Sequence, residues 1–261
     1  MKTITVHSYD EDVVESRNQD CPLPENYRWV RTQPLFRLVS GLTYALAMVF
    51  GEIYCRLFLH VKIRNRDVLK SGKDTGYFLY ANHTQPIGDV VLPAIVTWPR
   101  RIYTVAGTAN LGIPVIGKLL PALGILPVPD GSIHQGKKFR SAVKTRIAQK
   151  TCVVVYPEAH VWPYFTGIRP FPATSFHYPV EENVPSYCMT TTYQKRKFGK
   201  KPAITVYVDG PFLPDGSLPK KQRRQALASQ IAACMKRRSE MSNYEYIHYE
   251  MKIQPNPEEG P

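Results

Sequence analysis

The chain has 261 residues, 43% of them hydrophobic, and carries a formal net charge of +13. This composition is that of a globular chain that is long enough to bury a sizeable core, so a disordered polypeptide is excluded. The charge is uneven, because residues 1–26 hold six acidic residues against two basic ones. The remaining body is strongly basic and suits an anionic partner: a membrane surface, a nucleic acid, or a phosphorylated or CoA-type substrate.

The five cysteines are scattered singly along the chain and form no C-x-x-C pair. Their odd number and wide spacing argue against a disulfide framework and against a structural zinc site, and they suit a reducing cytosol. The N-terminus is acidic and lacks an apolar core segment, so we expect no secretory signal there.

Residues 1–33 are polar and interrupted by prolines, and we expect them to form a loosely held arm. Residues 34–61 form the most hydrophobic segment, whose uncharged span from Leu38 to Gly51 has 14 residues. A membrane-spanning helix needs about 20 apolar residues. Because apolar residues lie nearly all round this segment, it is either a buried core helix or a helix half sunk in a bilayer interface, with its arginines reaching the water.

The five residues Tyr77–Ala81 are aromatic and apolar, which predicts a short buried strand. Asn82 and His83 follow directly, and Pro86 suits the first turn of a helix. We therefore expect His83 in the loop at the carboxyl end of a strand, where open α/β sheets bind their ligands. Asp89 lies about one turn into the next element and can fold back toward the imidazole.

A histidine paired with a carboxylate has a defined chemistry. The carboxylate accepts from one ring nitrogen, which fixes the tautomer and stabilises imidazolium, while the other nitrogen takes a proton. Such a pair can deprotonate a substrate hydroxyl that then attacks an activated acyl group, without a serine or cysteine nucleophile. The alternative is a loop histidine satisfied by the backbone and an aspartate attracted by a helix dipole.

Strands and helices alternate along the rest of the chain. Apolar runs predict strands, and apolar residues at helical spacing predict helices. The expected strands are 102–106, 125–128, 152–156, 184–192 and 203–208, and the expected helices are 132–150 and 220–241. Glu158 directly follows the strand 152–156, which is again the ligand-binding position of an α/β sheet; a surface carboxylate is the alternative.

This alternation predicts an α/β domain over residues 62–242, with a mostly parallel central sheet flanked by helices. The polar arm 1–33 and the hydrophobic helical segment 34–61 precede the domain. Residues 243–261 are rich in proline and glutamate, and we expect them to form a flexible tail.

Four short motifs occur in the order known from the glycerolipid acyltransferases of the lysophosphatidic acid acyltransferase type, and the likeness covers about residues 34–240. The stretch from Asn82-His83 to Asp89 resembles the first motif, Asn-His-x4-Asp. Residues 111–117 with 123–128 resemble the second block. Residues 155–160 resemble the third motif, commonly Phe-Pro-Glu-Gly-Thr-Arg, and residues 184–187 resemble the fourth.

The resemblance implies an O-acyltransferase that moves a fatty acyl group from an acyl thioester to the hydroxyl of a lysolipid such as 1-acyl-glycerol-3-phosphate. His83 would be the general base and Asp89 would orient it, while Asn82 and Glu158 would contact the substrate. The donor would be acyl-CoA or acyl carrier protein, both of them substrates, so no tightly bound cofactor and no metal is expected. The basic surface and segment 34–61 would hold the enzyme on the cytoplasmic face of an anionic membrane, peripherally or shallowly inserted.

The motifs also depart from the family. Five residues separate His83 from Asp89 where four are usual, so Pro86 or Gly88 has to absorb one. The second block ends at Pro129-Asp130 and the third has Val161 where the family has the arginines that hold the acceptor's phosphate. A phosphate needs cations without needing a particular backbone position. The candidate substitutes are Arg169, Lys118, Lys137 and Arg101, and His160 is a further candidate for binding a different acceptor.

Two alternatives stand beside the enzyme. The first is a family relative that has lost catalysis and only binds lipid or acyl chains at a membrane surface. The second is a nucleic-acid-binding protein, suggested by basic clusters such as 195–197 and 220–224. No RNA-binding motif or DNA-reading module accompanies those clusters, so we expect no nucleic acid partner.

Overall fold

The computed structural model describes residues 2–14 and 21–252. Its centre is a seven-stranded sheet with the order β2-β8-β7-β3-β6-β4-β5. The strands are β2 (Lys62–Arg64), β3 (Tyr77–Ala81), β4 (Ile102–Ala106), β5 (Ile125–Pro127), β6 (Cys152–Val155), β7 (Ser186–Gln194) and β8 (Ala203–Phe212). All neighbouring strands are parallel except β7 and β8. The predicted mostly parallel sheet is confirmed.

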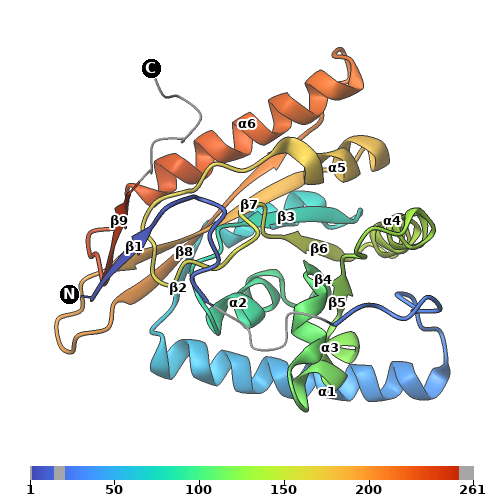
Figure 1. Ribbon diagram of the computed structural model, residues 1–261, viewed down its shortest axis with the longest axis horizontal. Helices are drawn as coiled ribbons and strands as arrows, with labels where there is room; N and C mark the ends of the chain where they lie inside the picture. Colours follow the sequence, from blue (N-terminus) through green and yellow to red (C-terminus); the bar gives the residue numbers. More distant parts are fainter. Residues whose placement is uncertain (1, 15–20, 253–261) are drawn as a thin grey trace, which may run out of the picture.

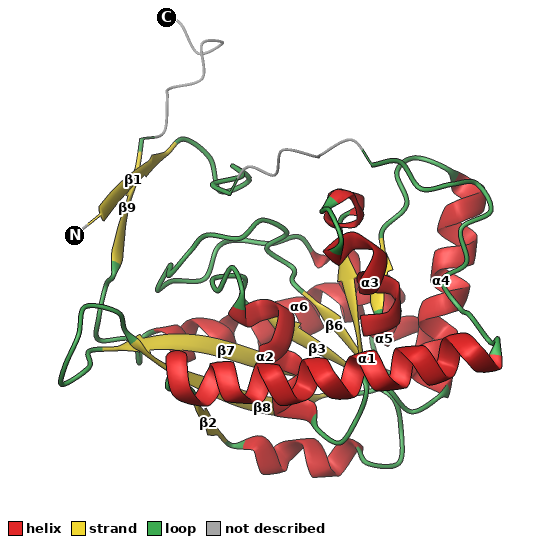
Figure 2. Ribbon diagram, turned by 90° about the horizontal axis from the view of Figure 1, so that it is seen from below, coloured by secondary structure: helices red, strands yellow, loops and turns green. Residues whose placement is uncertain are grey.

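Helices cover both faces of this sheet (Figure 1). They are α1 (Pro34–Ile53), α2 (Gly88–Thr97), α3 (Ile116–Leu123), α4 (Ile133–Ala148), α5 (His177–Glu182) and α6 (Lys220–Ser239). Helices α4, α5 and α6 contribute to one hydrophobic core, whereas α1 and α2 contribute to the core on the other face. Figure 2 shows α1 running along the outside of α2 and α3, both of which it contacts.

Strand β3 lies in the middle of the sheet and is buried on both faces. Phe78 and Tyr80 belong to the core under α4 and α6, whereas Leu79 and Ala81 belong to the core under α2. This division follows from the alternation of side chains along a strand. A strand covered on both faces has no polar side, which explains the continuous apolar run of its sequence.

Residues 34–58 of the segment 34–61 fold as one long helix, because α1 continues directly into a π-helical turn at Tyr54–Phe58. Ser40, Tyr44 and Gly51 face the body, and a Cβ at Gly51 would lie 3.2 Å from the Val91 side chain of α2. By length and composition alone, the stretch Pro34–Phe58 is able to cross a membrane. A core helix would be mostly buried, whereas only 22% of the most apolar window of this stretch is buried. The interpretation of this segment as a buried core helix is therefore wrong.

Within residues 2–14 and 21–33, the expected loosely held arm is corrected at two places. Strand β1 (Lys2–Val6) pairs in parallel with β9 (Ile247–Met251) in a separate two-stranded sheet. Trp29 is buried in the main core and donates from Nε1 to the Pro127 carbonyl at 2.8 Å. The flexible tail expected over residues 243–261 is also corrected in part, because residues 247–251 form strand β9. Residues 1, 15–20 and 253–261 lie outside the described residues.

Candidate active site

His83 follows the carboxyl end of β3, and its Nδ1 lies 2.8 Å from Oδ2 of Asp89. Asp89 sits in the first turn of α2 and is almost completely buried. A carboxylate can only accept, so Nδ1 carries the proton and Nε2 of the neutral ring is the free base. Among the described residues Nε2 has no hydrogen-bond partner, and the His83 side chain is 25% exposed. The free nitrogen is therefore open to a substrate hydroxyl.

The additional residue between His83 and Asp89 is taken up in a turn. The Asp89 N–H donates to the Gln85 carbonyl at 3.0 Å, and α2 begins at Gly88, two residues later than Pro86. A Cβ at Gly88 would lie 3.0 Å from Cβ of Gln85, so the turn has little room for a side chain at that position. The longer spacing still brings the imidazole and the carboxylate together.

Tyr156 holds the pair from a second side. Its ring stacks on the imidazole of His83, with the centroids 4.3 Å apart and the planes inclined by 25°. Its hydroxyl donates to the backbone carbonyl of Asp89 at 2.6 Å. Burial, together with the nearby Asp89 charge, raises the pKa of the Tyr156 phenol well above its ordinary value. The phenol is therefore protonated at neutral pH and remains a donor.

Glu158 positions the backbone of His83. Its Oε2 accepts from the His83 N–H at 3.1 Å and from Nη2 of Arg169 at 3.3 Å, and its Oε1 accepts from the Arg169 N–H at 3.0 Å. Glu158 and Arg169 are both buried. Since both carboxylate oxygens are used within the protein, the expectation that Glu158 contacts the substrate is corrected to a positioning role.

Arg169 is equally unsuited to the phosphate-binding role that we expected. Its side chain is fully buried against Glu158, and it also donates to the backbone carbonyls of Tyr9 and His160. Asn82 is buried as well, and it exchanges two hydrogen bonds with the backbone of Thr191, so that it ties β3 to β7. Neither side chain is free to bind an acceptor.

Two further segments hold the loop that carries His83. The Trp162 N–H donates to the His83 carbonyl at 3.0 Å, and the Tyr164 N–H donates to the Thr84 carbonyl at 2.8 Å. From β7, the Tyr193 hydroxyl lies 2.6 Å from Oγ1 of Thr84. Sequence reasoning missed Tyr156 and Tyr193. Tyr156 had one available signal, its place between a predicted strand and the Pro-Glu of the third motif.

A family model described as Acyltransferase matches residues 60–192, which include His83, Asp89 and Glu158. The chain belongs to the acyltransferase family. A comparison with curated proteins finds no match. Among solved structures, the chain is similar to PlsC, the 1-acyl-sn-glycerophosphate (LPA) acyltransferase from Thermotoga maritima. The likeness has a TM-score of 0.52 and 13% identity, and it covers 80% of this chain and 97% of the other. The predicted resemblance is thus confirmed for family and fold.

The remaining predicted substrate ligands of this acyltransferase lie apart from the histidine. Arg101 donates to Oγ of Ser40 and to the Ala122 carbonyl, both at 2.6 Å. Lys118 and Lys137 are exposed on α3 and on α4, and α4 covers the opposite face of the sheet from α2. His160 faces Asp12, with Nδ1 and Oδ2 3.7 Å apart. In the described part of the chain, none of these four side chains contacts His83 or Asp89.

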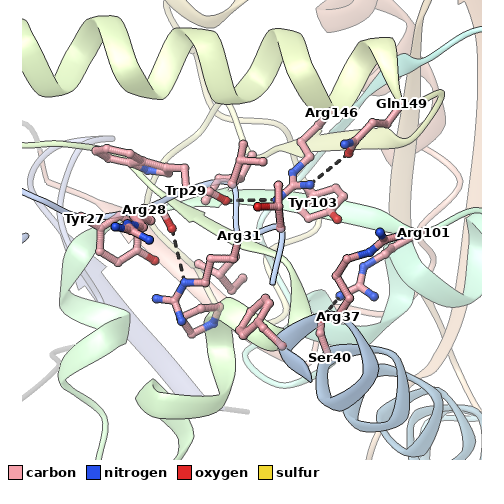
Figure 3. Close-up of a pocket in the computed structure, with 16 residues that line it drawn as sticks. Tyr27, Arg28, Trp29, Arg31, Arg37, Ser40, Arg101, Tyr103, Arg146 and Gln149 are labelled. Atoms are coloured by element: carbon pink, nitrogen blue, oxygen red, sulfur yellow. Dashed lines mark hydrogen bonds between the residues drawn. The ribbon is translucent and has the colours of Figure 1, made fainter. Parts of the chain in front are cut away.

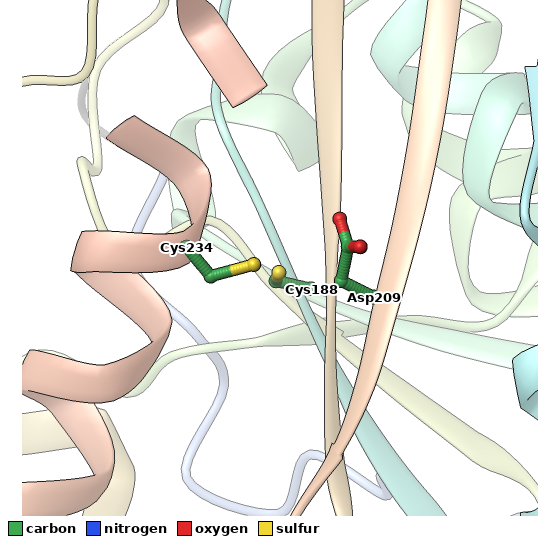
Figure 4. A group of neighbouring side chains, drawn as sticks. All are labelled: Cys188, Asp209 and Cys234. Carbon is green, nitrogen blue, oxygen red and sulfur yellow. The ribbon is translucent and has the colours of Figure 1, made fainter. Parts of the chain in front are cut away.

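One group of described side chains has the composition of a metal site. Cys188, Asp209 and Cys234 bring their ligand atoms within 4.8 Å of one another (Figure 4). Arg238, however, already donates to both carboxylate oxygens of Asp209, at 2.9 and 2.6 Å. Cys188 and Cys234 belong to the core under α6, on the opposite face of the sheet from α2. The group is therefore separate from His83, and its carboxylate already forms an ion pair with Arg238.

Proposed function

We propose that this acyltransferase moves a fatty acyl group from an acyl thioester to the hydroxyl of a lysolipid. The observation that supports the proposal is the 2.8 Å contact between Nδ1 of His83 and Oδ2 of Asp89, with Nε2 left free. The pair lies at the carboxyl end of a central strand and within the residues that match the family. That end of the sheet is where α/β folds bind ligands.

In the proposed reaction, Nε2 of His83 takes the proton of the acceptor hydroxyl while its oxygen attacks the thioester carbonyl carbon. Asp89 stabilises the imidazolium that forms. The carbon–sulfur bond then breaks, and the departing sulfur takes the proton from Nε2, so that the products are an ester and a thiol. A positioned base contributes about 10²–10⁴ to the rate, and holding the two reactants together supplies much of the remainder.

The proposed donor is acyl-CoA or acyl carrier protein, and the proposed acceptor is a lysolipid of the 1-acyl-glycerol-3-phosphate kind. Support for a lipid acceptor comes from α1. Its exposed apolar residues recur at helical spacing and form an apolar stripe consisting of Leu35, Leu38, Leu42, Leu46 and Phe50. A helix that packs on the protein along one side and exposes such a stripe on the other suits an in-plane position at a membrane surface. We place the enzyme there, peripherally or shallowly inserted, on the cytoplasmic face.

The test is acyl transfer from radiolabelled acyl-CoA and acyl carrier protein to a panel of lysolipids, with and without a phosphate. Wild type should form a product, and His83→Ala should lower the rate by at least about 10²-fold. His134→Ala, an exposed histidine on α4, serves as the matched control and should keep full activity. Full activity in His83→Ala would remove His83 as the base. Vesicle binding without any product would favour a relative that only binds lipid.

A further inference from the structure

A cavity of about 500 Å³ lies at the other end of the sheet from the histidine (Figure 3). Its walls come from residues 27–32, the first turns of α1, the start of β4 and of β5, and the end of α4. His83 and Glu158, in contrast, follow the carboxyl ends of β3 and β6. Because β3, β6, β4 and β5 are parallel, the cavity lies at the amino ends of the same strands and is separate from the catalytic pair.

The lining of this cavity is strongly basic. It contains five arginines and no aspartate or glutamate; they are Arg28, Arg31, Arg37, Arg101 and Arg146. Within residues 2–14 and 21–252, none of the five forms an ion pair. Cations gathered in a concave site without a counter-ion repel one another and attract an anion.

The deepest of these side chains is Arg146, which is only 8% exposed. Its Nη1 and Nη2 donate to Oε1 of Gln149 at 3.0 Å and to the Trp29 carbonyl at 3.1 Å, and its guanidinium lies 4.0 Å from the ring centroid of Tyr103. Its Nε is buried without a partner among the described residues, as is Nε of Arg101. Burial lowers the pKa of Arg146, and the like charge of Arg101 adds to this effect. All its partners are neutral, and a buried charge of this kind calls for a counter-charge.

The cavity lies at the N-terminal end of α1, the helix that carries the apolar stripe. Phe36 and Arg37 line it, whereas their neighbours Leu35 and Leu38 are 73% and 61% exposed. A lipid held beside this end of the helix would bring its headgroup near these arginines. Guanidinium groups match phosphate oxygens with paired hydrogen bonds, which makes phosphate the anion best suited to such a lining.

We propose that this cavity binds a phosphomonoester, presented by the headgroup of a membrane lipid. The bound lipid is additional to the acceptor at His83, and it anchors the first turns of α1 at the bilayer surface. The shared chemistry is the doubly charged phosphate, and a soluble phosphate ester is the other source that an experiment has to distinguish.

The test measures binding in a His83→Ala background, so that the outcome is independent of the proposed reaction. Vesicles of phosphatidylcholine carry either phosphatidic acid, a phosphomonoester, or phosphatidylglycerol, a phosphodiester, at matched surface potential. The variant Arg31→Gln/Arg37→Gln removes two cavity charges at partly or fully exposed positions, which leaves the buried Arg146 in place. The matched control, Arg224→Gln/Arg237→Gln, removes two charges from α6. A parallel titration with glycerol 3-phosphate, without vesicles, tests the soluble source.

The parent protein should bind the phosphatidic acid vesicles at least about tenfold more tightly than the phosphatidylglycerol vesicles, and only the cavity variant should lose this preference. Binding of glycerol 3-phosphate that the cavity variant alone loses, without a vesicle preference, supports the phosphomonoester site and assigns it to a soluble ester. Equal losses in both double variants would reduce the effect to surface charge and overturn the proposal. So would the absence of any preference and of glycerol 3-phosphate binding in the parent.

Discussion

The two oxygens of Asp89 have different surroundings. Oδ2 accepts from Nδ1 of His83 and from the backbone N–H of Gln85, both at 2.8 Å, whereas the buried Oδ1 has no partner among the described residues. Burial raises the pKa of Asp89 above its ordinary value, and the hydrogen bond from His83 offsets part of this rise. Burying the ionised carboxylate of Asp89 therefore costs folding free energy. The ionised form is also the one that accepts the hydrogen bond from Nδ1 of His83.

The substitution Asp89→Asn should separate activity from stability. An amide no longer selects the Nδ1–H tautomer or stabilises imidazolium, so kcat should fall by about 10²–10⁴-fold. Because the native pKa of Asp89 is raised, the wild type loses stability as pH rises from the ordinary aspartate pKa through the native one. The neutral variant lacks that loss and should unfold at pH 7 at no lower a temperature than wild type. Steady-state rates and thermal unfolding check both results.

The proposed role of Asp89 in the reaction would be contradicted if Asp89→Asn lost stability and activity together. The residue would then be structural. Asn82→Asp is a suitable comparison, because Asn82 forms two hydrogen bonds to the backbone of Thr191, one as donor and one as acceptor. A carboxylate there cannot donate, so this variant should lose stability first.

The sequence predicted the residues of the motif, but it did not predict what all of them contact. The position after a buried strand made His83, Asp89 and Glu158 candidates, and the resemblance of four motifs to the acyltransferases favoured them over the alternatives. That Glu158 binds the backbone of His83 depends on Arg169, whose own partners include the Tyr9 carbonyl, about 160 positions away in sequence. Which atoms of a carboxylate remain free is decided by such distant neighbours, and a local pattern does not contain them.

At the scale of elements, α1 has the most exposed apolar surface. Three consecutive members of its apolar stripe, Leu38, Leu42 and Leu46, are each about 60% exposed. Removing such surface from water is worth about 25 cal/mol per Å², so insertion of these side chains favours the membrane-bound state. On the opposite side, Tyr44 is buried against the body, and its hydroxyl accepts from the Ile102 N–H at 3.3 Å. The fold thus presents one side of α1 outward.

Replacing all three of these leucines by glutamine should weaken binding to anionic vesicles by at least about tenfold in a pelleting assay. Glutamine is nearly as good a helix former as leucine, so the circular dichroism of the variant should match wild type. The control carries glutamine at three exposed apolar positions elsewhere, Ile133, Phe198 and Leu213. Equal losses in the two triple variants would show that general hydrophobicity, not the stripe, supports membrane binding.

Helices and strands were predictable where the local spacing of apolar residues indicates which side is buried. The strand Tyr77–Ala81 and the helix Ile133–Ala148 show period and composition that few other structures allow. Strands β1 and β9 lacked such a signal, because each is short and its partner lies at the other end of the chain. The arginine-lined cavity was equally hidden, since its residues come from four separate parts of the sequence.

For the whole molecule, α1 connects the two ends of the sheet. Its Ser40 contacts Arg101 at the arginine-lined cavity, and its Gly51 packs on Val91 in α2, the helix that carries Asp89. These two residues are eleven positions apart along the helix, a distance of about 16.5 Å. One side of α1 thus links the cavity to the helix that carries Asp89, while its other side presents the apolar stripe to the outside.

The two-stranded sheet of β1 and β9 supports the loop that carries His83 from outside the main sheet. Tyr249 of β9 stacks on the buried Trp162, with centroids 5.0 Å apart and planes inclined by 7°, and its hydroxyl donates to the Pro163 carbonyl at 2.9 Å. The backbone N–H of Trp162 in turn donates to the His83 carbonyl at 3.0 Å. The two-stranded sheet that contains Tyr249 thus reaches the loop that carries His83 through one residue, Trp162.

Tyr249→Ala should lower the free energy of unfolding by about 1–3 kcal/mol, because it removes the stacked ring and its hydrogen bond together. It should also lower kcat, since the backbone that carries His83 loses its outer support. Tyr249→Phe keeps the ring and loses only the hydrogen bond, so it should cost about 0.5–1.5 kcal/mol and leave kcat close to wild type. Denaturant unfolding and steady-state rates on both variants test the assignment. If kcat were unchanged in Tyr249→Ala, β9 would stabilise the fold without affecting His83. The loop that carries His83 would then keep its position without the Tyr249 ring stacked on Trp162.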